Sequence, residues 1–275
     1  MTSELTIEPL TPFIGAEITG VDLREVTQEQ VAGIRAALLK HQVVFFRDQT
    51  LSQEEHIHFA RQFGELEIHP ATPRDQDNPE VLHIAHGPDS KGRENSWHSD
   101  VTWREKPSLG SILKAVEVPA VGGDTLFANM SEAYERLPDT LKEKIAGKTA
   151  VHDIARVFAG RLNKTADQLR ETYPVMEHPV VRTHPETGAS VLYVNYAFTS
   201  HITGMDEAES EELLQTLYRT ASDPEIQCRF RWKAGSLAFW DNRACQHFAS
   251  SDYFPQVRKM ERVTIAGDRP YFRAA

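Results

Sequence analysis

The spacing of apolar positions along the chain predicts a few helices among many short strands. Three segments open with the Ser/Thr/Asp-x-x-Glu/Gln pattern that caps the amino end of a helix: Thr27–Gln30, Ser52–Glu55 and Asp206–Glu209. Apolar residues follow the first segment at positions 31, 34 and 38, which is helical spacing. We expect the second helix to run to about Phe63 and the third to about Tyr218.

Most of the remaining chain has the short apolar or alternating runs that are typical of strands. Residues 185–188, Pro-Glu-Thr-Gly, have the composition of a tight turn between two such runs. The segment 131–176 differs, because helix signals dominate it, and we expect a helix-rich insertion over a functional site there. The expected strands are 41–46, 81–86, 109–117, 124–128, 178–184, 190–195, 227–233, 236–240, 244–249 and 258–266.

This order of elements predicts a mainly β protein, with an antiparallel core and peripheral helices. No repeat, low-complexity segment or Gly/Ser/Pro-rich linker divides the chain, so residues 1–275 are expected to form a single domain. Periodicity alone does not separate a sandwich from a barrel or a jelly roll.

Composition and charge narrow the class of protein. The formal net charge of −10 disfavours a nucleic-acid partner. No apolar run approaches 18 residues, so we expect no membrane span, and the lack of a basic, apolar leader at Met1 favours the cytoplasm. Two cysteines, Cys228 and Cys245, are too few for a disulfide scaffold and are expected as reduced thiols in strands. We also expect a homo-oligomer, either a dimer or a tetramer.

The most informative chemical pattern is His98-Ser99-Asp100 together with the distant His247. Two imidazoles and one carboxylate hold non-haem Fe(II) on one face and leave the other face open. In an extended strand His98 and Asp100 point to the same side, because side chains alternate. The structural alternative for His247 is a core histidine satisfied by a hydrogen bond.

Two other histidine pairs compete for the same role and are poorer chelates. His56 and His58 fall in a predicted helix, where positions i and i+2 do not share a face. His83 and His86 fall in a predicted strand, where positions i and i+3 point to opposite sides.

Arg258 and Arg262 are expected on one side of a strand, about 13 Å apart. Two guanidinium groups that point into a β core are costly unless anions pair with them. They therefore indicate either two anion-binding sites, which we prefer, or two structural salt bridges. An acidic protein that binds an anion has to concentrate positive charge locally.

These patterns, taken together, resemble the taurine dioxygenase family. The family comprises Fe(II)- and 2-oxoglutarate-dependent dioxygenases, among them the 2,4-dichlorophenoxyacetate and alkylsulfate dioxygenases. The resemblance is spread over nearly the whole chain. It is carried by Ile14–Asp22, Asn95–Thr102, Gly122–Leu126, His178–Pro185, Trp240–His247 and Arg262–Asp268.

The resemblance implies a double-stranded β-helix, that is, a jelly-roll, cupin-like core with iron near one open end. It implies Fe(II), 2-oxoglutarate and O2 as cofactor and co-substrates, with His98, Asp100 and His247 as iron ligands. It places the far carboxylate of 2-oxoglutarate on Thr125 and Arg258. The anionic head of the substrate would lie on His69, Asn95 and Arg262.

The chain departs from the taurine enzyme around the substrate. Ala71-Thr72-Pro73 replaces a segment that contains a tyrosine, and Ile154 follows His152-Asp153 where the taurine enzyme has a phenylalanine. Either Asn95 or Glu94 takes the place of the asparagine that helps to hold taurine. An anion site is kept, but the surrounding pocket is altered.

We therefore expect a dioxygenase that hydroxylates a small anionic organic substrate, with taurine or another alkylsulfonate favoured. The products would be succinate, CO2 and an aldehyde plus sulfite. The alternative substrates are an alkyl sulfate ester or an aryloxyalkanoate carboxylate. A non-enzymatic cupin-like binding protein is the alternative from another class, and it leaves the combination of the triad with Arg258 unexplained.

Overall fold

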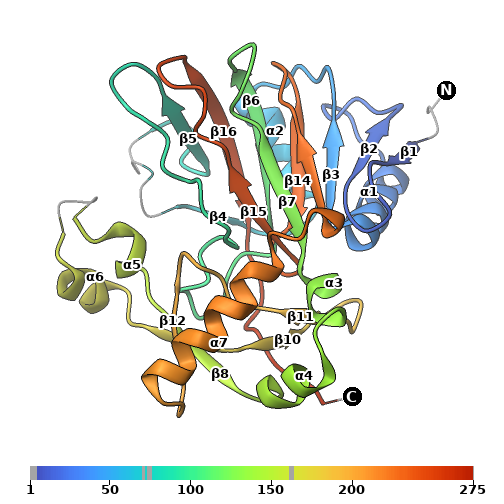
Figure 1. Cartoon of the computed structure of the whole chain (residues 1–275). Coiled ribbons are helices and arrows are strands. Elements are labelled where there is room, and N and C mark those ends of the chain that lie inside the picture. Colours follow the sequence, from blue (N-terminus) through green and yellow to red (C-terminus); the bar gives the residue numbers. More distant parts are fainter. Residues whose placement is uncertain (1–4, 70–71, 73–75, 161–163, 275) are drawn as a thin grey trace.

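A large sheet forms one wall of the protein (Figure 1). The computed structural model describes residues 5–69, 72, 76–160 and 164–274. Within these ranges eight strands join this sheet, and their pairing is antiparallel except between β2 and β3. In sheet order they are β1 (Thr6–Pro9), β2 (Ala16–Thr19), β3 (Val43–Phe46), β14 (Leu237–Asp241), β6 (Gly110–Glu117), β16 (Arg258–Ile265) and β4 (Leu66–Glu67), with β5 (Val81–His86) also paired to β16.

A second, three-stranded sheet shares a core with the large one. It consists of β13 (Gln227–Phe230), β7 (Thr125–Asn129) and β15 (Cys245–Ala249), all antiparallel. Buried side chains from both sheets pack together, and the rings of Phe45 and Phe230 stack with centroids 4.0 Å apart. Strands β15 and β16 belong to these two sheets. Because the sheets pack against each other, side chains from both strands can line one site.

Helices α1 (Gln28–His41) and α2 (Gln53–Arg61) pack against the large sheet. Ile34 and Leu38 of α1 and Phe59 of α2 join Phe46 and Val263 of the sheet in one buried cluster. Both helices begin with the predicted capping boxes, in which side chain and backbone hydrogen-bond reciprocally. The apolar face of each helix is therefore buried against the sheet.

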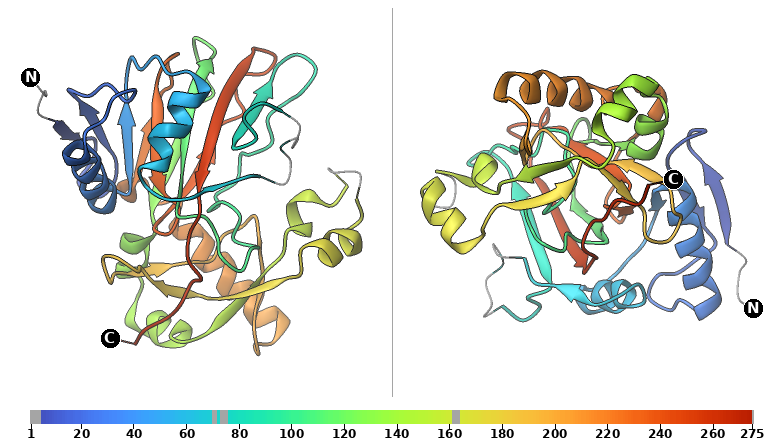
Figure 2. Two further views of the ribbon diagram at one scale, coloured as in Figure 1. Left: turned by 180° about the vertical axis from the view of Figure 1, so that it is seen from behind. Right: turned by 90° about the horizontal axis from the view of Figure 1, so that it is seen from below.

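The rest of the chain forms a separate layer below the large sheet in Figure 1, and Figure 2 shows it from two further directions. A three-stranded sheet and a hairpin form its strands: β8 (Thr149–His152), β9 (Met176–Pro179) and β12 (Thr199–Ile202), and β10 (Val181–Thr183) with β11 (Ser190–Leu192). Its helices are α3 (Met130–Glu135), α4 (Asp139–Ile145), α5 (Ala155–Phe158), α6 (Ala166–Thr172) and α7 (Glu207–Thr220), with a 3-10 turn at Pro224–Ile226.

Each expected strand overlaps an observed one, and the three capped helices are confirmed. In its described residues the segment 131–176 carries four helices, but it also contributes β8 to a sheet, which was not predicted from the sequence. The short strands β1, β2, β4 and β12 were also missed. Cys228 and Cys245 are buried free thiols in β13 and β15, as expected.

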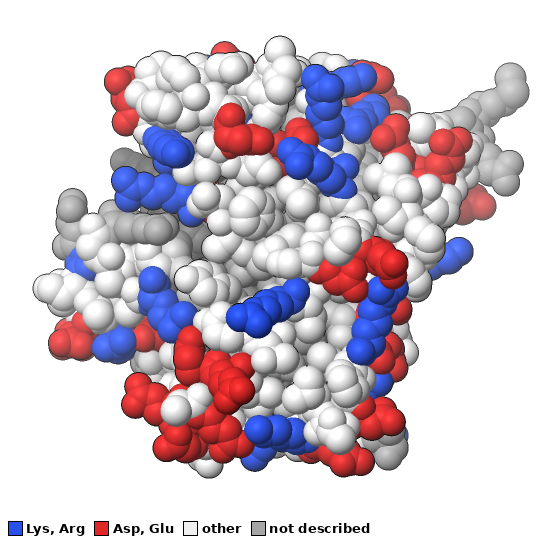
Figure 3. Space-filling model, viewed as in Figure 1, with Lys and Arg blue, Asp and Glu red and all other residues white. Residues whose placement is uncertain are grey.

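Two surface observations bear on partners. Lysines and arginines lie interspersed with acidic residues on the face shown in Figure 3. No helix in the described part of the chain is both long and apolar enough to cross a bilayer.

Candidate metal centre and substrate pocket

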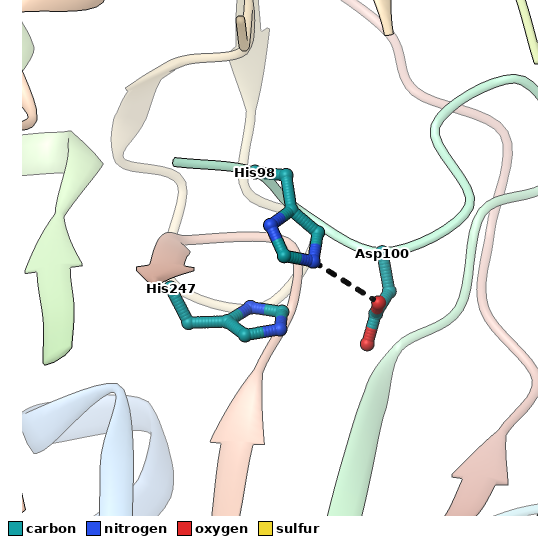
Figure 4. A group of neighbouring side chains, drawn as sticks. All are labelled: His98, Asp100 and His247. Atoms are coloured by element: carbon teal, nitrogen blue, oxygen red, sulfur yellow. Dashed lines mark ion pairs between the residues drawn. The ribbon is translucent and has the colours of Figure 1, made fainter. Parts of the chain in front are cut away.

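The side chains of His98, Asp100 and His247 lie together, with His98 and Asp100 on one segment and His247 on β15 (Figure 4). One potential ligand atom from each lies within 4.8 Å of the other two. His98 and His247 also form an isolated β-bridge, with reciprocal backbone hydrogen bonds of 3.1 and 2.8 Å. Two segments 149 positions apart in the sequence are thereby joined at the level of the ligands.

The expectation of an extended strand through His98 and Asp100 is wrong. Beyond the single bridge at His98 the backbone turns, and Val101 has a φ of 49°. A strand cannot continue through that conformation, which side chains other than glycine adopt at a cost. The ligands converge because of the turn and its supports, and not because of strand alternation.

The side chain of Asn242 supports this turn. Its Oδ1 accepts from the backbone N–H of Asp100 at 2.6 Å, and its Nδ2 donates to the carbonyl of Asp100 at 2.9 Å. The same Nδ2 lies 3.2 Å from the backbone and side-chain oxygens of Ser108. Asn242 is fully buried, and it binds Asp100 as a neighbouring strand would. The sequence shows Asn242 only as part of the Trp240–His247 motif and carries no signal for this role.

The protonation of the three side chains suits a metal. His98 Nδ1 donates a hydrogen bond to the carbonyl of Ser96, at 2.7 Å. The other ring nitrogen, Nε2, is then the one that can bind a metal, and it lies 3.8 Å from Asp100. Burial lowers the pKa of His247 to about 3, with a further contribution from His98, so its imidazole is neutral. Burial alone would raise the pKa of Asp100, but Arg262 and, after it, the neighbouring imidazoles together outweigh burial and hold the pKa well below its usual range.

The donor set fits a divalent iron ion. Two neutral imidazoles and an ionised carboxylate are the facial arrangement that holds Fe(II) and leaves positions open. His247 Nδ1 has no hydrogen-bond partner among the described residues, although it is buried. His56, from one competing pair, is instead buried away from this group, with its Nε2 on the carbonyl of Ile112.

Arg262 and His69 lie beside the triad. Arg262 Nη1 contacts both carboxylate oxygens of Asp100, at 3.1 and 3.0 Å, and both side chains line a cavity of about 200 Å³. His69 lines the same cavity, and burial, followed by the charge of Arg262, lowers its pKa to about 4. A neutral imidazole and a guanidinium therefore present donors to this cavity.

The rest of this cavity is largely apolar. Its walls come from β5, from the turn after Asp100, from α5 and from the segment before β12. The apolar lining consists of Leu82, Ile84, Val101, Trp103, Val157, Phe158, Ala197 and Phe198. Such a cavity accommodates an anionic head with an apolar body.

Asn95 does not reach the cavity. It is exposed and lines neither this cavity nor the adjoining one, whereas Glu94 lines both. The carboxylate of Glu94 lies 3.3 Å from His86 Nε2. Of the two positions that the sequence left open, the structure therefore brings Glu94, and not Asn95, to the wall of the cavity.

A second cavity of about 60 Å³ adjoins the first and is lined by Thr125, Arg258 and His247. The guanidinium of Arg258 is buried, and in the described part of the chain no carboxylate forms an ion pair with it. Its Nε donates to the carbonyl of Gly123 at 3.2 Å, and its Nη2 has no partner among the described residues. Burial lowers the pKa of Arg258, and a buried guanidinium that is not paired with an anion is energetically costly.

The chain matches the family model described as "Taurine catabolism dioxygenase TauD, TfdA family" over residues 6–264. It is 39% identical, over 97% of its length and 91% of the relative, to an α-ketoglutarate-dependent sulfate ester dioxygenase of Pseudomonas putida. It is 37% identical, over 97% of its length and 86% of the relative, to an alkylsulfatase of Acinetobacter baylyi. A crystal structure of a taurine dioxygenase from Burkholderia xenovorans superposes with a TM-score of 0.85 at 42% identity, covering 97% of this chain and 90% of that one.

The chain belongs to the TauD/TfdA family of dioxygenases. It is an oxidoreductase that depends on Fe(II), 2-oxoglutarate (α-ketoglutarate) and O2. The resemblance seen in the sequence is confirmed, and the family gives no support to a non-enzymatic binding protein.

Proposed function

We propose that this dioxygenase hydroxylates an organosulfur anion with an apolar body, a sulfate ester or a sulfonate. The observation that carries the proposal is the cavity beside Asp100, which combines Arg262 and His69 with apolar walls. Hydroxylation at the carbon that bears the sulfur group or its ester oxygen gives a product that collapses to an aldehyde, with sulfite or sulfate released.

The roles of the side chains follow from their positions. His98, Asp100 and His247 hold Fe(II), and bound iron with 2-oxoglutarate and O2 supplies the oxidation, which leaves succinate and CO2. Arg258 and Thr125 bind the far carboxylate of 2-oxoglutarate in the smaller cavity. A guanidinium fork and a hydroxyl group are both strong donors to a carboxylate.

The head of the substrate binds Arg262 and His69. A sulfonate or sulfate has three terminal oxygens, which a guanidinium and a neutral imidazole N–H can share. Arg262 is shared with Asp100, so the head lies next to the metal ligands and places the neighbouring carbon close to the iron. The turn at Val101 brings Asp100, and with it the guanidinium of Arg262, to one wall of the larger cavity.

The apolar walls favour an alkyl or aryl body over taurine. The ammonium group of taurine would lose water against Trp103, Phe158 and Phe198, and apart from the carboxylate of Glu94, which lines the same cavity, these walls offer it no partner. An alkyl chain gains about 25 cal/mol for each Å² of apolar surface removed from water. The relatives that act on sulfate esters agree with this preference.

The test is a substrate panel of taurine, hexanesulfonate, hexyl sulfate and 2,4-dichlorophenoxyacetate. We expect succinate formation with hexyl sulfate or hexanesulfonate to exceed that with taurine at least tenfold, and sulfate or sulfite release identifies which of the two is used. Arg262→Ala should abolish turnover of every anionic substrate in the panel and leave 2-oxoglutarate binding in place. His69→Ala should lower the same turnover to a smaller extent. A preferred substrate without negative charge would contradict the proposal.

We also propose the finer features of the architecture. The two facing sheets are a jelly-roll, double-stranded β-helix core in a single domain of residues 1–275, and segment 131–176 covers the site through Val157 and Phe158 of α5. A patch of exposed apolar side chains near edge strand β1, formed by Ile7, Leu10 and Phe13, favours a homo-oligomer, either a dimer or a tetramer. We further propose that the protein is located in the cytoplasm. Sedimentation equilibrium and cell fractionation test these two points.

A further inference from the structure

Trp232 lies directly behind the smaller cavity and has no role in the function so far described. It is 4% exposed, and its indole Nε1–H donates to Thr125 Oγ1 at 2.9 Å. The pairing of β13 with β7 explains this contact. Phe230 is the register partner of Thr125, and Trp232 follows two positions later with its ring 4.9 Å from that of Phe230.

The indole N–H determines what the hydroxyl of Thr125 can do. A threonine hydroxyl carries one donor hydrogen and two acceptor lone pairs. Trp232 occupies an acceptor position, so the O–H of Thr125 remains to donate elsewhere. No described residue is seen to accept it, and Thr125 lines the smaller cavity with Arg258.

Trp232 also contacts the other half of this anion site. The guanidinium carbon of Arg258 lies 6.0 Å from the centroid of the indole ring, at the outer limit of a cation–π interaction. Tyr253 lies at the same distance. Arg258 has no ion-pair partner among the described side chains, so these rings are part of what makes a buried guanidinium tolerable.

We propose that Trp232 is a positioning residue for the far carboxylate of 2-oxoglutarate. It orients the hydroxyl of Thr125 toward that carboxylate and supports Arg258 beside it. This inference rests on the proposed roles of Thr125 and Arg258. It adds a third residue, which touches neither co-substrate nor metal.

A double-mutant cycle tests the proposal. Trp232→Phe keeps a ring and removes the N–H, and Thr125→Val removes the hydroxyl. The dissociation constant of 2-oxoglutarate is measured by calorimetry on the Mn(II)-loaded protein. We expect Trp232→Phe to raise it about threefold to tenfold, the usual effect of one hydrogen bond. In the Thr125→Val background the same change should raise it less than twofold.

Two further measurements separate positioning from general structural damage. 2-Oxobutyrate has the same 2-oxo acid end but lacks the far carboxylate, so Trp232→Phe should leave its binding unchanged. Thr125→Ala also removes the hydroxyl and replaces the valine variant as the second background if that variant does not fold. Trp232→Phe should raise the KM for 2-oxoglutarate by a larger factor than it lowers kcat, because the indole acts on binding of the far carboxylate.

The outcomes are distinguishable. If Trp232→Phe weakens 2-oxoglutarate and 2-oxobutyrate equally, or weakens 2-oxoglutarate equally in both Thr125 backgrounds, its effect is structural and the proposal is overturned. An unchanged dissociation constant also overturns it. If the unmodified protein shows no preference for 2-oxoglutarate over 2-oxobutyrate, the assignment of the smaller cavity fails instead.

Discussion

Two arginines four residues apart on β16 have opposite electrostatic surroundings. Arg262 contacts the carboxylate of Asp100, whereas Arg258 is buried without an ion-pair partner among the described residues. A buried guanidinium in such a setting is costly in the free protein. Binding of an anion removes that cost, so we expect the cavity that contains Arg258 to favour a dianionic co-substrate.

Arg258→Ala should therefore raise the KM for 2-oxoglutarate far more than the KM for the prime substrate. Loss of a hydrogen bond to a charged group costs about 1.5–3 kcal/mol, or roughly tenfold to a hundredfold in KM. Steady-state kinetics with each substrate varied in turn measures the effect. His69→Ala, which changes the larger cavity and not the smaller one, is the matched control and should show the reverse pattern. An unchanged KM for 2-oxoglutarate would make Arg258 structural.

At the scale of elements, the turn after His98 decides the geometry of the site. Val101 in this turn has a left-handed backbone conformation, which valine does not favour. The two hydrogen bonds between Asn242 and the backbone of Asp100 hold the turn in place. Asn242 also binds Ser108, at the start of β6. One amide thus joins the metal-binding turn to both neighbouring strands, β14 and β6.

Asn242→Ala should weaken metal binding about tenfold to a hundredfold, as loss of an outer-shell contact typically does. It leaves the N–H and carbonyl of Asp100 without their partner, so the turn samples other conformations. Competition for Co(II) against a chelator measures the effect. Asn195→Ala, which removes another buried amide, serves as a comparison, since Asn195 bonds Thr102 and not Asp100. Equal metal affinity in the Asn242 variant and the unmodified protein would refute the role.

The sequence predicted most elements because local signals specify them. The capping boxes at Thr27 and Ser52 satisfy backbone donors within a few residues, so they act before any tertiary contact forms. Strand β8 was missed because its four residues acquire their partners only from β9 and β12, which lie far along the chain. Two-residue β4 carries no periodicity at all.

The candidate site shows the same division. His98, Asp100 and His247 were found from ligand chemistry and family motifs, although the backbone that unites them is a turn. Glu94 and Trp232 could not be selected from sequence. Their roles depend on which side chain enters a cavity and on the register of β13 against β7.

At the scale of the whole molecule, a buried ionic network ties the layers together. Arg243 binds Asp241 with two hydrogen bonds of 2.8 and 2.7 Å and reaches Glu186 in the β10–β11 turn. Glu186 also pairs with Arg35 of α1, and His184 contacts Asp241 at 3.0 Å. These ion pairs therefore link the large sheet to the β10–β11 hairpin of the lower layer and to helix α1.

This network makes stability depend on pH at the acidic end. Burial would raise the pKa of Asp241, but the hydrogen bonds from Arg243 and His184 outweigh it and lower the pKa well below its usual range. A group whose folded pKa is lowered stabilises the fold above its unfolded pKa of about 3.9, and that contribution is lost as pH falls through the folded value.

Asp241→Asn should lower the free energy of unfolding by about 3–5 kcal/mol near pH 7, because Arg243 loses its paired carboxylate. The difference from the unmodified protein should shrink as pH falls from about 5 toward 3. Urea unfolding across this range measures it. Asp167→Asn, at a highly exposed position, should show no such change. A difference that stays constant with pH would show that the charge of Asp241 does not contribute.

The central claim is that His98, Asp100 and His247 hold Fe(II) while Arg258 and Thr125 hold 2-oxoglutarate against it. Its most direct test is anaerobic addition of Fe(II) and then 2-oxoglutarate, followed by visible absorption. The account predicts a metal-to-ligand charge-transfer band in the unmodified protein, and loss of both the band and succinate formation in Asp100→Ala. No band in the unmodified protein, or an undiminished band in Asp100→Ala, would contradict it.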